Sequence, residues 1–411
     1  MADDVLLNAV LLGNITAYQV GIYHDLLPLC DLRRPNLKNR YFFPQATITK
    51  NTLLLTPWLE VYGTSRVRRS MAVFERLAFC LATHAAFVGD DALMLLLEEL
   101  EGLPTDVALI DIAANYGHLS LVQLLHSRSY ATTWAMDWAA ANGHFDVLEF
   151  LHLHRSEGCT VYAMNGAAMN GHAEIVQWLH FHRQEGCTKN ALNSAAEHGH
   201  LEIVKFLHDH RTEGGSEQAI NFSASNGHME TLEWLHWNRA DGATTSAIDW
   251  AATNGHFDAV KFLLAHRSEG GTSLAMDGAA RNGFLDILIV LYAAGLTCTT
   301  EAMDGAATNG HLDIVEWLQA EVDATCTAEA MVGAARNGHL AILQWLFMHS
   351  KPRDDQRVLC AAAEEGHLDM VSWLLENGIH KTRLVSQALH KAMSRGHIEI
   401  VELLCERATD L

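Results

Sequence analysis

Cysteine, proline and long apolar runs are scarce in this chain of 411 residues. Its eight cysteines include no CxxC pair, which argues against a disulfide scaffold and is typical of a reducing compartment. Only six prolines and 29 glycines occur, so collagen-like and linker-rich architectures are excluded. No run of 18 apolar residues is found, and the acidic beginning MADDVLLNAVLLGN differs from a secretory signal. We therefore expect no membrane segment and a cytoplasmic location, with the nucleus as the alternative.

Positive charge is also in short supply. The chain has 28 Lys and Arg against 49 Asp and Glu, a formal net charge of -21. Such a surface repels nucleic-acid phosphates and anionic membranes, so neither is expected as a partner. The charge is uneven: residues 1–84 carry nine Lys and Arg against six Asp and Glu, whereas residues 85–411 carry 19 against 43.

The common catalytic signatures are absent. No Walker glycine loop, GxGxxG, GxSxG or HExxH motif occurs. Histidine is abundant, and HxH pairs stand at His152/His154, His180/His182 and His208/His210. Side chains two residues apart do not share a helix face, so these pairs are not expected to bind zinc. The sequence therefore predicts no enzyme, no catalytic residue, no cofactor and no metal site.

A Gly-His pair recurs along most of the chain. Its spacing is 26 to 30 residues, most often 28. Twelve repeats therefore cover residues 85–411, the first of them centred on Gly89 with Asp90 in place of histidine. The later repeats are centred on Gly117, Gly143, Gly171, Gly199, Gly227, Gly255, Gly283, Gly310, Gly338, Gly366 and Gly396, and Phe284 replaces histidine once.

Residues 1–84 do not follow this period. The string NAVLLGNITAYQV around Gly13 is interpreted as a degenerate unit, and MAVFERLAFCLATHAAF as a helix that caps the array. The basic stretches RRPNLKNRYFFP and TSRVRRS carry no helical period. They are expected to be solvated loops or a positive arm on the acidic array, with nuclear localisation or phosphate binding as the alternative.

Each repeat predicts two helices. A threonine eleven residues before the glycine, such as Thr132, is expected to cap the first helix, which carries a pair of small alanines. After Asn-Gly, strings such as GHLEIVKFLHDHR place apolar residues on one stripe of the second helix. Basic residues and then a glycine, such as Arg155 and Gly158, are expected to end that helix with a left-handed cap. An aromatic ladder that includes Trp178 is expected to pack between adjacent second helices.

A helix pair with one apolar stripe cannot bury its core alone, so neighbouring units must stack. Strings such as AATNGHLDIVEWL, residues 306–318, resemble the ankyrin repeat, and the resemblance covers all twelve units. The chain departs from the usual period of about 33 and the T-P-L-H-x-A opening. Its 28-residue units resemble the expanded ankyrin arrays of oomycetes. In place of the TPLH histidine stand Asp137, Asn165, Asn193, Asn221, Asp249, Asp277 and Asp304, and only His390 restores it.

The resemblance implies an all-α ankyrin solenoid of about twelve helix-turn-helix units. The shorter period predicts a second helix about one turn longer than usual and a hairpin finger reduced to a tight turn, so recognition is expected on the exposed face of the first helices. Function is expected where the period is broken. Five residues before the glycine, bulky Trp138, Phe222 and Trp250 alternate with glycines in other units. Two residues before it stand Met169, Glu197, Arg281, Arg336 and Glu364.

These two positions are about one helical turn apart and share a face, which by resemblance lines a concave surface that binds proteins. The alternative is that the aromatic rings fill gaps between units. We predict a monomeric scaffold or adaptor that binds a protein partner. The alternative function is a substrate-recruiting arm of ubiquitin-ligase type, docked through residues 1–84, although no F-box pattern is present. An enzyme within residues 1–84 is disfavoured because no site is recognisable there.

Overall fold

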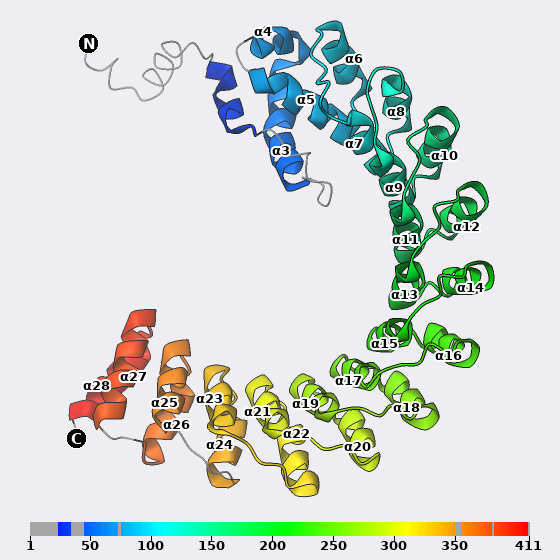
Figure 1. Ribbon diagram of the computed structural model, residues 1–411. Coiled ribbons are helices and arrows are strands. Elements are labelled where there is room, and N and C mark those ends of the chain that lie inside the picture. Colours follow the sequence, from blue (N-terminus) through cyan, green and yellow to red (C-terminus); the bar gives the residue numbers. More distant parts are fainter. Residues whose placement is uncertain (1–23, 34–44, 73–74, 350–354, 380–381, 410–411) are drawn as a thin grey trace, which may run out of the picture. The chain divides into compact units, whose positions relative to one another are not determined.

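The computed structural model describes residues 24–33, 45–72, 75–349, 355–379 and 382–409. Every regular element in these ranges is a helix and none is a strand, which confirms the all-α prediction (Figure 1). Two compact units divide the chain: Met1–Ala191 with Asp209–Glu213, and Leu192–His208 with Gly214–Leu411. The degenerate repeat predicted around Gly13 lies outside the described residues.

Four elements precede the array: η1 (His24–Asp31), α3 (Gln45–Tyr62), η2 (Thr64–Arg66) and α4 (Val67–Met71). The stretch TSRVRRS was expected to lack helical structure, but η2 and α4 cover it, and Val67 and Ser70 are buried there. Helix α3 packs against α5 (Glu75–Val88), and the buried Asn51 donates from Nδ2 to the carbonyl of Arg33 at 2.6 Å. The expected boundary between residues 84 and 85 lies inside α5.

Twelve helix pairs follow, as predicted. The first helices are α5, α7 (Leu109–Asn115), α9 (Thr133–Ala141), α11 (Val161–Met169), α13 (Lys189–Glu197), α15 (Glu217–Ser225), α17 (Ser246–Thr253), α19 (Ser273–Asn282), α21 (Thr300–Asn309), α23 (Ala328–Arg336), α25 (Asp355–Glu365) and α27 (Thr382–Arg395). The second helices are α6 (Asp91–Glu99), α8 (Leu119–Leu125), α10 (Phe145–His154), α12 (Ala173–His182), α14 (Leu201–His210), α16 (Met229–Asn238), α18 (Phe257–His266), α20 (Leu285–Ala293), α22 (Leu312–Trp317) with the π turn η3 (Leu318–Val322), α24 (Leu340–His349), α26 (Leu368–Glu376) and α28 (Ile398–Thr409).

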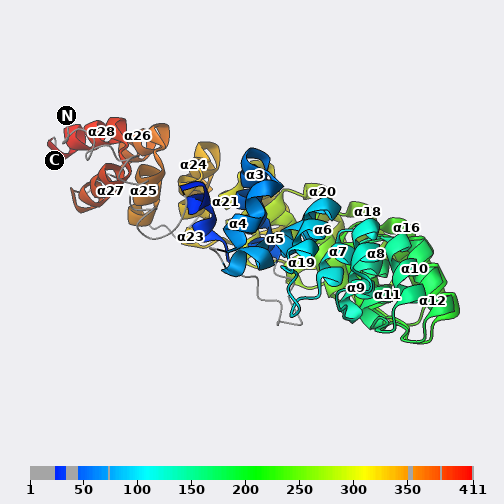
Figure 2. The same cartoon turned by 90° about the horizontal axis from the view of Figure 1, so that it is seen from above.

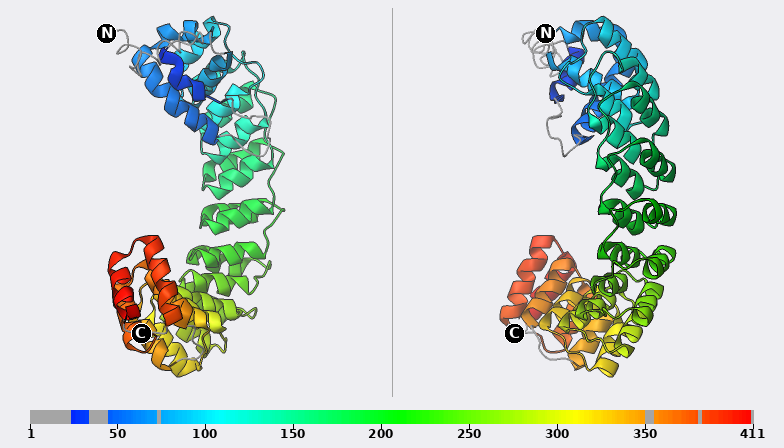
Figure 3. Two further views of the ribbon diagram at one scale, coloured as in Figure 1. Left: turned by 90° about the vertical axis from the view of Figure 1, so that its left-hand side faces the viewer. Right: turned by 45° about the vertical axis from the view of Figure 1, so that its right-hand side comes forward.

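Within each compact unit the helices stack in two rows. In the first, α5, α7, α9 and α11 lie side by side, and α6, α8 and α10 form the second row (Figure 1). In the second, the first helices α15, α17, α19, α21, α23, α25 and α27 lie side by side (Figure 1 and Figure 3). Helices α25 to α28 end the chain (Figure 2). Small Ala139 and Ala140 and the apolar Val147, Leu148 and Leu151 are buried between the rows. Each buried large apolar side chain contributes roughly 1.5–3 kcal/mol.

The Gly-His turn couples each unit to the next. Gly143 has φ 84°, a left-handed conformation that glycine adopts without strain. A Cβ added to it would lie 2.6 Å from Cε1 of His172, because the ring of the next unit covers the glycine. His144 Nε2 also bonds the carbonyl of Asn115 at 3.2 Å. Phe284 covers Gly255 in the same way, so ring packing is the shared feature and the hydrogen bond is an addition.

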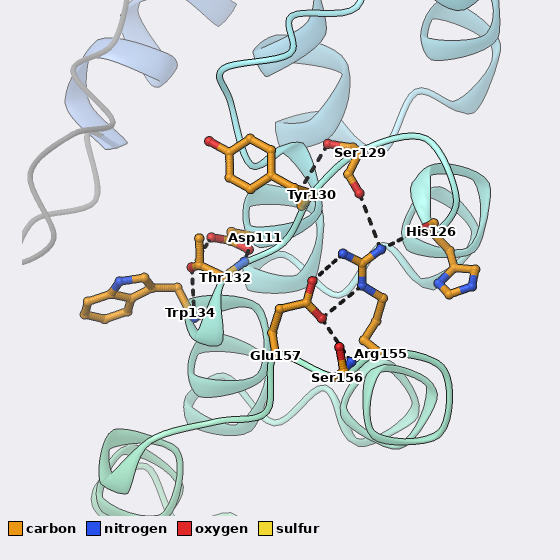
Figure 4. Close-up of polar contacts among 9 residues, drawn as sticks. All are labelled: Asp111, His126, Ser129, Tyr130, Thr132, Trp134, Arg155, Ser156 and Glu157. Carbon is orange, nitrogen blue, oxygen red and sulfur yellow. Dashed lines mark hydrogen bonds and ion pairs between the residues drawn. The ribbon is translucent and has the colours of Figure 1, made fainter.

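A buried acid or amide replaces the missing TPLH histidine. Asp111 accepts the backbone N–H of Thr132 at 2.8 Å and its hydroxyl at 2.6 Å, and Thr132 Oγ1 accepts the N–H of Trp134 at 3.1 Å (Figure 4). Asn165 makes the same pair of contacts with Thr188, each at 3.0 Å, but its amide donates to the hydroxyl. The predicted threonine cap is therefore held by the preceding unit. The same contact joins Asp137 to Thr160, Asn193 to Ser216, Asn221 to Thr244, Asp249 to Thr272, Asp277 to Thr299 and Asp304 to Thr327.

The connection between units is a short loop, as the reduced finger predicted, but its glycine does not cap the helix. Helix α10 ends at His154, and its C-cap Arg155 is extended, with φ -126° and ψ 158°. Gly158 has φ 73° three residues later, inside the loop. The Arg183 guanidinium of the next unit lies where a Cβ of Gly158 would be. The predicted left-handed cap is therefore wrong, because this glycine makes room for an arginine. The predicted extra turn of the second helix is wrong as well, because α10 ends four residues before Gly158.

Asp111 offers a test of the bond between units. Asp111→Ala leaves the Thr132 N–H without its acceptor, and we expect a loss of about 1–3 kcal/mol in the free energy of unfolding. Asp111→Asn reproduces the arrangement at Asn165 and should cost about 1 kcal/mol or less. Burial raises the pKa of Asp111 to about 6 in the folded chain, above its ordinary 3.8. The folded wild type therefore gains a proton first, and its stability relative to Asp111→Asn should rise as the pH falls from 7 to 5.

Urea titrations of both variants at the two pH values measure these differences. Equal losses of unfolding free energy for Asp111→Asn and Asp111→Ala would contradict the role of Asp111 as the acceptor for Thr132. A stability difference between wild type and Asp111→Asn that does not change with pH would contradict the raised pKa.

Candidate protein-binding surface

The histidines of the HxH pairs lie in a ladder of aromatic rings along the second helices. The His152 ring meets the edge of Trp178 with centroids 4.9 Å apart, and Trp178 stacks on His182 at 4.6 Å. Trp178 thus packs against the preceding second helix, α10, and against His182 on its own helix, α12, which agrees with the predicted packing of the aromatic position between adjacent second helices. In the described part of the chain, no group of three or more histidines, cysteines or acids is arranged to hold a metal.

The loops between units contain a repeated Arg–His–Glu contact. Arg183 Nη1 lies 3.5 Å from Nδ1 of His152 and pairs with Glu185, and Arg239 Nη1 lies 3.0 Å from Nδ1 of His208. Arginine can only donate, so the histidine nitrogen is the acceptor in this contact. Burial, and then the arginine charge, lower the pKa of His152, His180 and His236. The bond from Arg267 lowers the pKa of Glu269 to about 2. These groups stabilise the stack.

Two cysteines, Cys159 and Cys187, lie buried in the loops between units. Burial raises the pKa of the Cys159 thiol to about 12 and that of the Cys187 thiol to about 11. Both are therefore protonated at neutral pH, and a thiol is a weak nucleophile compared with its thiolate.

None of the described helices combines the length and the apolar character that a bilayer span requires.

The first helices of the first compact unit carry a cluster of aromatic side chains. The Trp134 ring lies 5.0 Å from Trp138 on α9 and 6.1 Å from Tyr162 on α11, with the Trp134 and Tyr162 planes 14° apart. Tyr162 is 57% exposed and Met169 40% exposed. The charged residue of these two helices, Asp137, is buried. Trp134 and Trp138 are half-buried. Trp134, Trp138 and Tyr162, together with Met169 at the end of α11, are here named the aromatic patch, and none of the four carries a charge.

The alternation of glycine and bulky residues on the first helices has a packing cause. A Cβ added to Gly166 would lie 2.6 Å from Cβ of Ala141, the residue two before the glycine of the preceding unit. Gly278 meets Thr253 and Gly333 meets Thr308 in the same way. The two positions singled out by the sequence therefore touch each other between units, and a bulky residue at one depends on what occupies the other.

Phe222 and Trp250 are brought together on the second compact unit. Their rings stack with centroids 5.7 Å apart and planes 11° apart, on the adjacent helices α15 and α17. Trp250 still exposes 41% of its surface. Its ring therefore both packs against the preceding unit and reaches solvent.

The predicted charged residues lie further along the second unit. Arg281 pairs with Glu301 at 3.0 Å, and Glu364 pairs with Lys391 at 3.2 Å. Glu197 is half-buried, and Arg336 is exposed. Exposed ion pairs contribute only about 0–1 kcal/mol, so a partner could replace them at little cost. The eight predicted residues are divided between the two units: Trp138 and Met169 belong to the first and the other six to the second.

Sequence reasoning missed Trp134 and Tyr162. Each stands two residues after a capping threonine, in the first turn of a first helix. Leu274 occupies the same position and is 64% exposed. The usable signal was a large apolar residue at a repeat position where other units carry Asn190, Gln218 or Ser246.

Comparison with family models identifies the fold family. A model described as ankyrin repeats (3 copies) matches residues 164–241, 220–302, 303–385 and 331–411, and a model described as ankyrin repeats (many copies) matches residues 136–180. The first model alone extends without a gap from residue 164 to residue 411, more than half of the chain. The chain therefore belongs to the ankyrin-repeat family, whose members generally mediate protein–protein interaction.

No curated protein sequence matches the chain significantly. Among solved structures, the human ASB11 ankyrin repeat domain matches with 17% identity over 46% of this chain and 96% of that domain, with a TM-score of 0.37. This likeness is too loose to support conclusions about function. The narrower resemblance to oomycete arrays stays a prediction.

The Arg–His contacts predict a pH dependence of stability. Because the pKa of His152 and His180 is lowered on folding, the unfolded chain gains protons first as the pH falls below 6.5. The stability that these neutral rings contribute is therefore lost on acidification. The double variant His152→Gln/His180→Gln keeps an acceptor for each arginine without a titrating ring. Its thermal midpoint should fall less between pH 7 and pH 5 than that of the wild type.

Replacing His198, an exposed residue outside these contacts, by Gln provides the matched control. A double variant whose midpoint changes with pH as steeply as the wild type would show that these rings do not cause the dependence.

Proposed function

We propose that this chain is a non-enzymatic adaptor or scaffold that binds a protein partner through the exposed face of its first helices. The observation that carries the proposal is the aromatic patch on α9 and α11. Centres of protein interfaces are depleted in charge and enriched in Tyr, Trp and Met, which is the composition of this patch. Membership of the ankyrin-repeat family supports a protein as the partner. A monomeric, cytoplasmic protein is the simplest version.

The packing of the first helices makes this surface suitable for binding. Helices α9 and α11 are each held at their start by the acid of the preceding unit and on their inner side by buried alanines. The aromatic rings are therefore carried by a backbone that is ordered before a partner arrives. A preordered surface loses less conformational entropy on binding, which favours affinity.

A second candidate is a recruiting arm that docks another component through residues 1–84. The observation in its favour is the exposed apolar surface of α3, where Leu53 is 70% and Val61 71% exposed. In the full chain, Leu53→Asp/Val61→Asp should then release one partner and retain another. If every partner is retained, the recruiter is wrong.

Truncation of the tryptophans tests the adaptor proposal. Loss of an interface hot spot costs roughly 2 kcal/mol or more of binding, whereas loss of a core tryptophan costs about 3–5 kcal/mol of stability. For Trp138→Ala and Trp250→Ala we expect a small change in thermal midpoint and binding weakened by tens of fold. The measurement uses the partner obtained from a native-lysate pull-down, with Trp237→Ala on α16 as the control, since that ring is 66% exposed. Strong destabilisation with normal binding by the folded fraction would assign Trp138 and Trp250 to the core.

A further inference from the structure

The surroundings of the aromatic patch favour a positively charged ligand. Residues 75–191 carry 14 Asp and Glu against 5 Lys and Arg. Three of these five cations pair with acids: Arg128 with Glu98 at 2.7 Å, Arg155 with Glu157, and Arg183 with Glu185. Most of the local positive charge is therefore already neutralised, and the acids dominate the electrostatic potential that an approaching partner meets.

Two buried carboxylates lie directly behind the patch. Asp111 bonds Thr132, whose hydroxyl accepts the N–H of Trp134 (Figure 4). In the next unit, Asp137 bonds Thr160, whose hydroxyl accepts the N–H of Tyr162. Both partners of these acids are neutral threonines. The negative charge of each carboxylate is thus not cancelled by a bonded cation. A single threonine links each carboxylate to the residue that carries a ring, Trp134 or Tyr162.

We infer that the aromatic patch binds an arginine-bearing segment of the partner, whose guanidinium stacks on the Trp134 and Tyr162 rings. The inference rests on the proposed function and adds the chemistry of the ligand. The two ring planes are nearly parallel, which suits a planar guanidinium better than the compact ammonium of lysine. The surrounding acids attract such a segment and repel acidic ones.

Selection from a displayed library of random peptides tests this inference on the full chain. Peptides are selected on the wild type and counter-selected on Trp134→Leu/Tyr162→Leu, which keeps apolar side chains but removes both rings. We expect the patch-dependent peptides to share an arginine. Replacing that arginine by Gln should weaken binding about 3- to 30-fold, the range that cation–π contacts span, and replacement by Lys should have a smaller effect. Higher salt should slow association.

Trp237→Leu, at an exposed tryptophan on α16, is the matched control and should leave binding unchanged. Tyr162→Leu alone repeats the test if the double variant fails to fold. Patch-dependent peptides without arginine would overturn the inference and leave the proposed function intact. If all selected peptides bind the wild type and the ring variants equally well, both the inference and the role of the patch in protein binding are wrong.

Discussion

The first helices from α9 to α23 each begin at a hydrogen bond that their own unit cannot make. The threonine that starts a first helix needs a buried acceptor for its backbone N–H, and that acceptor is the acid or amide of the preceding unit, as Asp111 is for Thr132. A buried donor without an acceptor costs about 1–3 kcal/mol, so the contact fixes where each helix begins relative to its neighbour. A ring of the next unit, such as His172 over Gly143, covers the glycine at the other end of the first helix. Together they hold successive first helices in one register, and this register brings Trp134 and Tyr162 together.

Positions that repeat from unit to unit and positions that vary between units are therefore under different constraints. The Gly-His ring, the capping threonine and the Arg–His–Glu contact repeat because the stack requires them. The position five residues before the glycine varies, but only part of that variation is free. Gly166 is small because Ala141 lies against it, whereas Trp250 has room to stack on Phe222. A departure from the repeat therefore marks a candidate for partner binding only where the side chain also reaches solvent, as those of Tyr162 and Trp250 do.

The sequence predicted the part of the structure that local periodicity controls. Helix pairs, their number, the threonine caps and the shortened connection all follow from the spacing of glycine, threonine and apolar residues. It did not predict the Asp111–Thr132 bond, because the partners lie 21 residues apart and no short motif joins them. Gly158 was misread for a related reason: a glycine after a helix is the usual left-handed cap, and only the arginine of the next unit reveals the other cause. Of the aromatic patch, the sequence analysis named Trp138 and Met169. It missed Trp134 and Tyr162 because it compared only the positions five and two residues before the glycine, whereas these two residues stand two after the capping threonine.

The use of arginine inside the stack also determines what the surface can offer. The junction arginines of the first unit are tied to acids two residues further on and lie against histidines or carbonyls of the preceding unit. Their charge is therefore not available to a partner, while the exposed acids remain. The second unit differs, because Arg281 and Arg336 lie on exposed ends of its first helices. One fold thus presents an uncharged aromatic surface with acids behind it in the first unit and a surface of mixed charge in the second. The stack requires the same few contacts in both units. The exposed side chains of the first helices can therefore differ between the units without a change of fold.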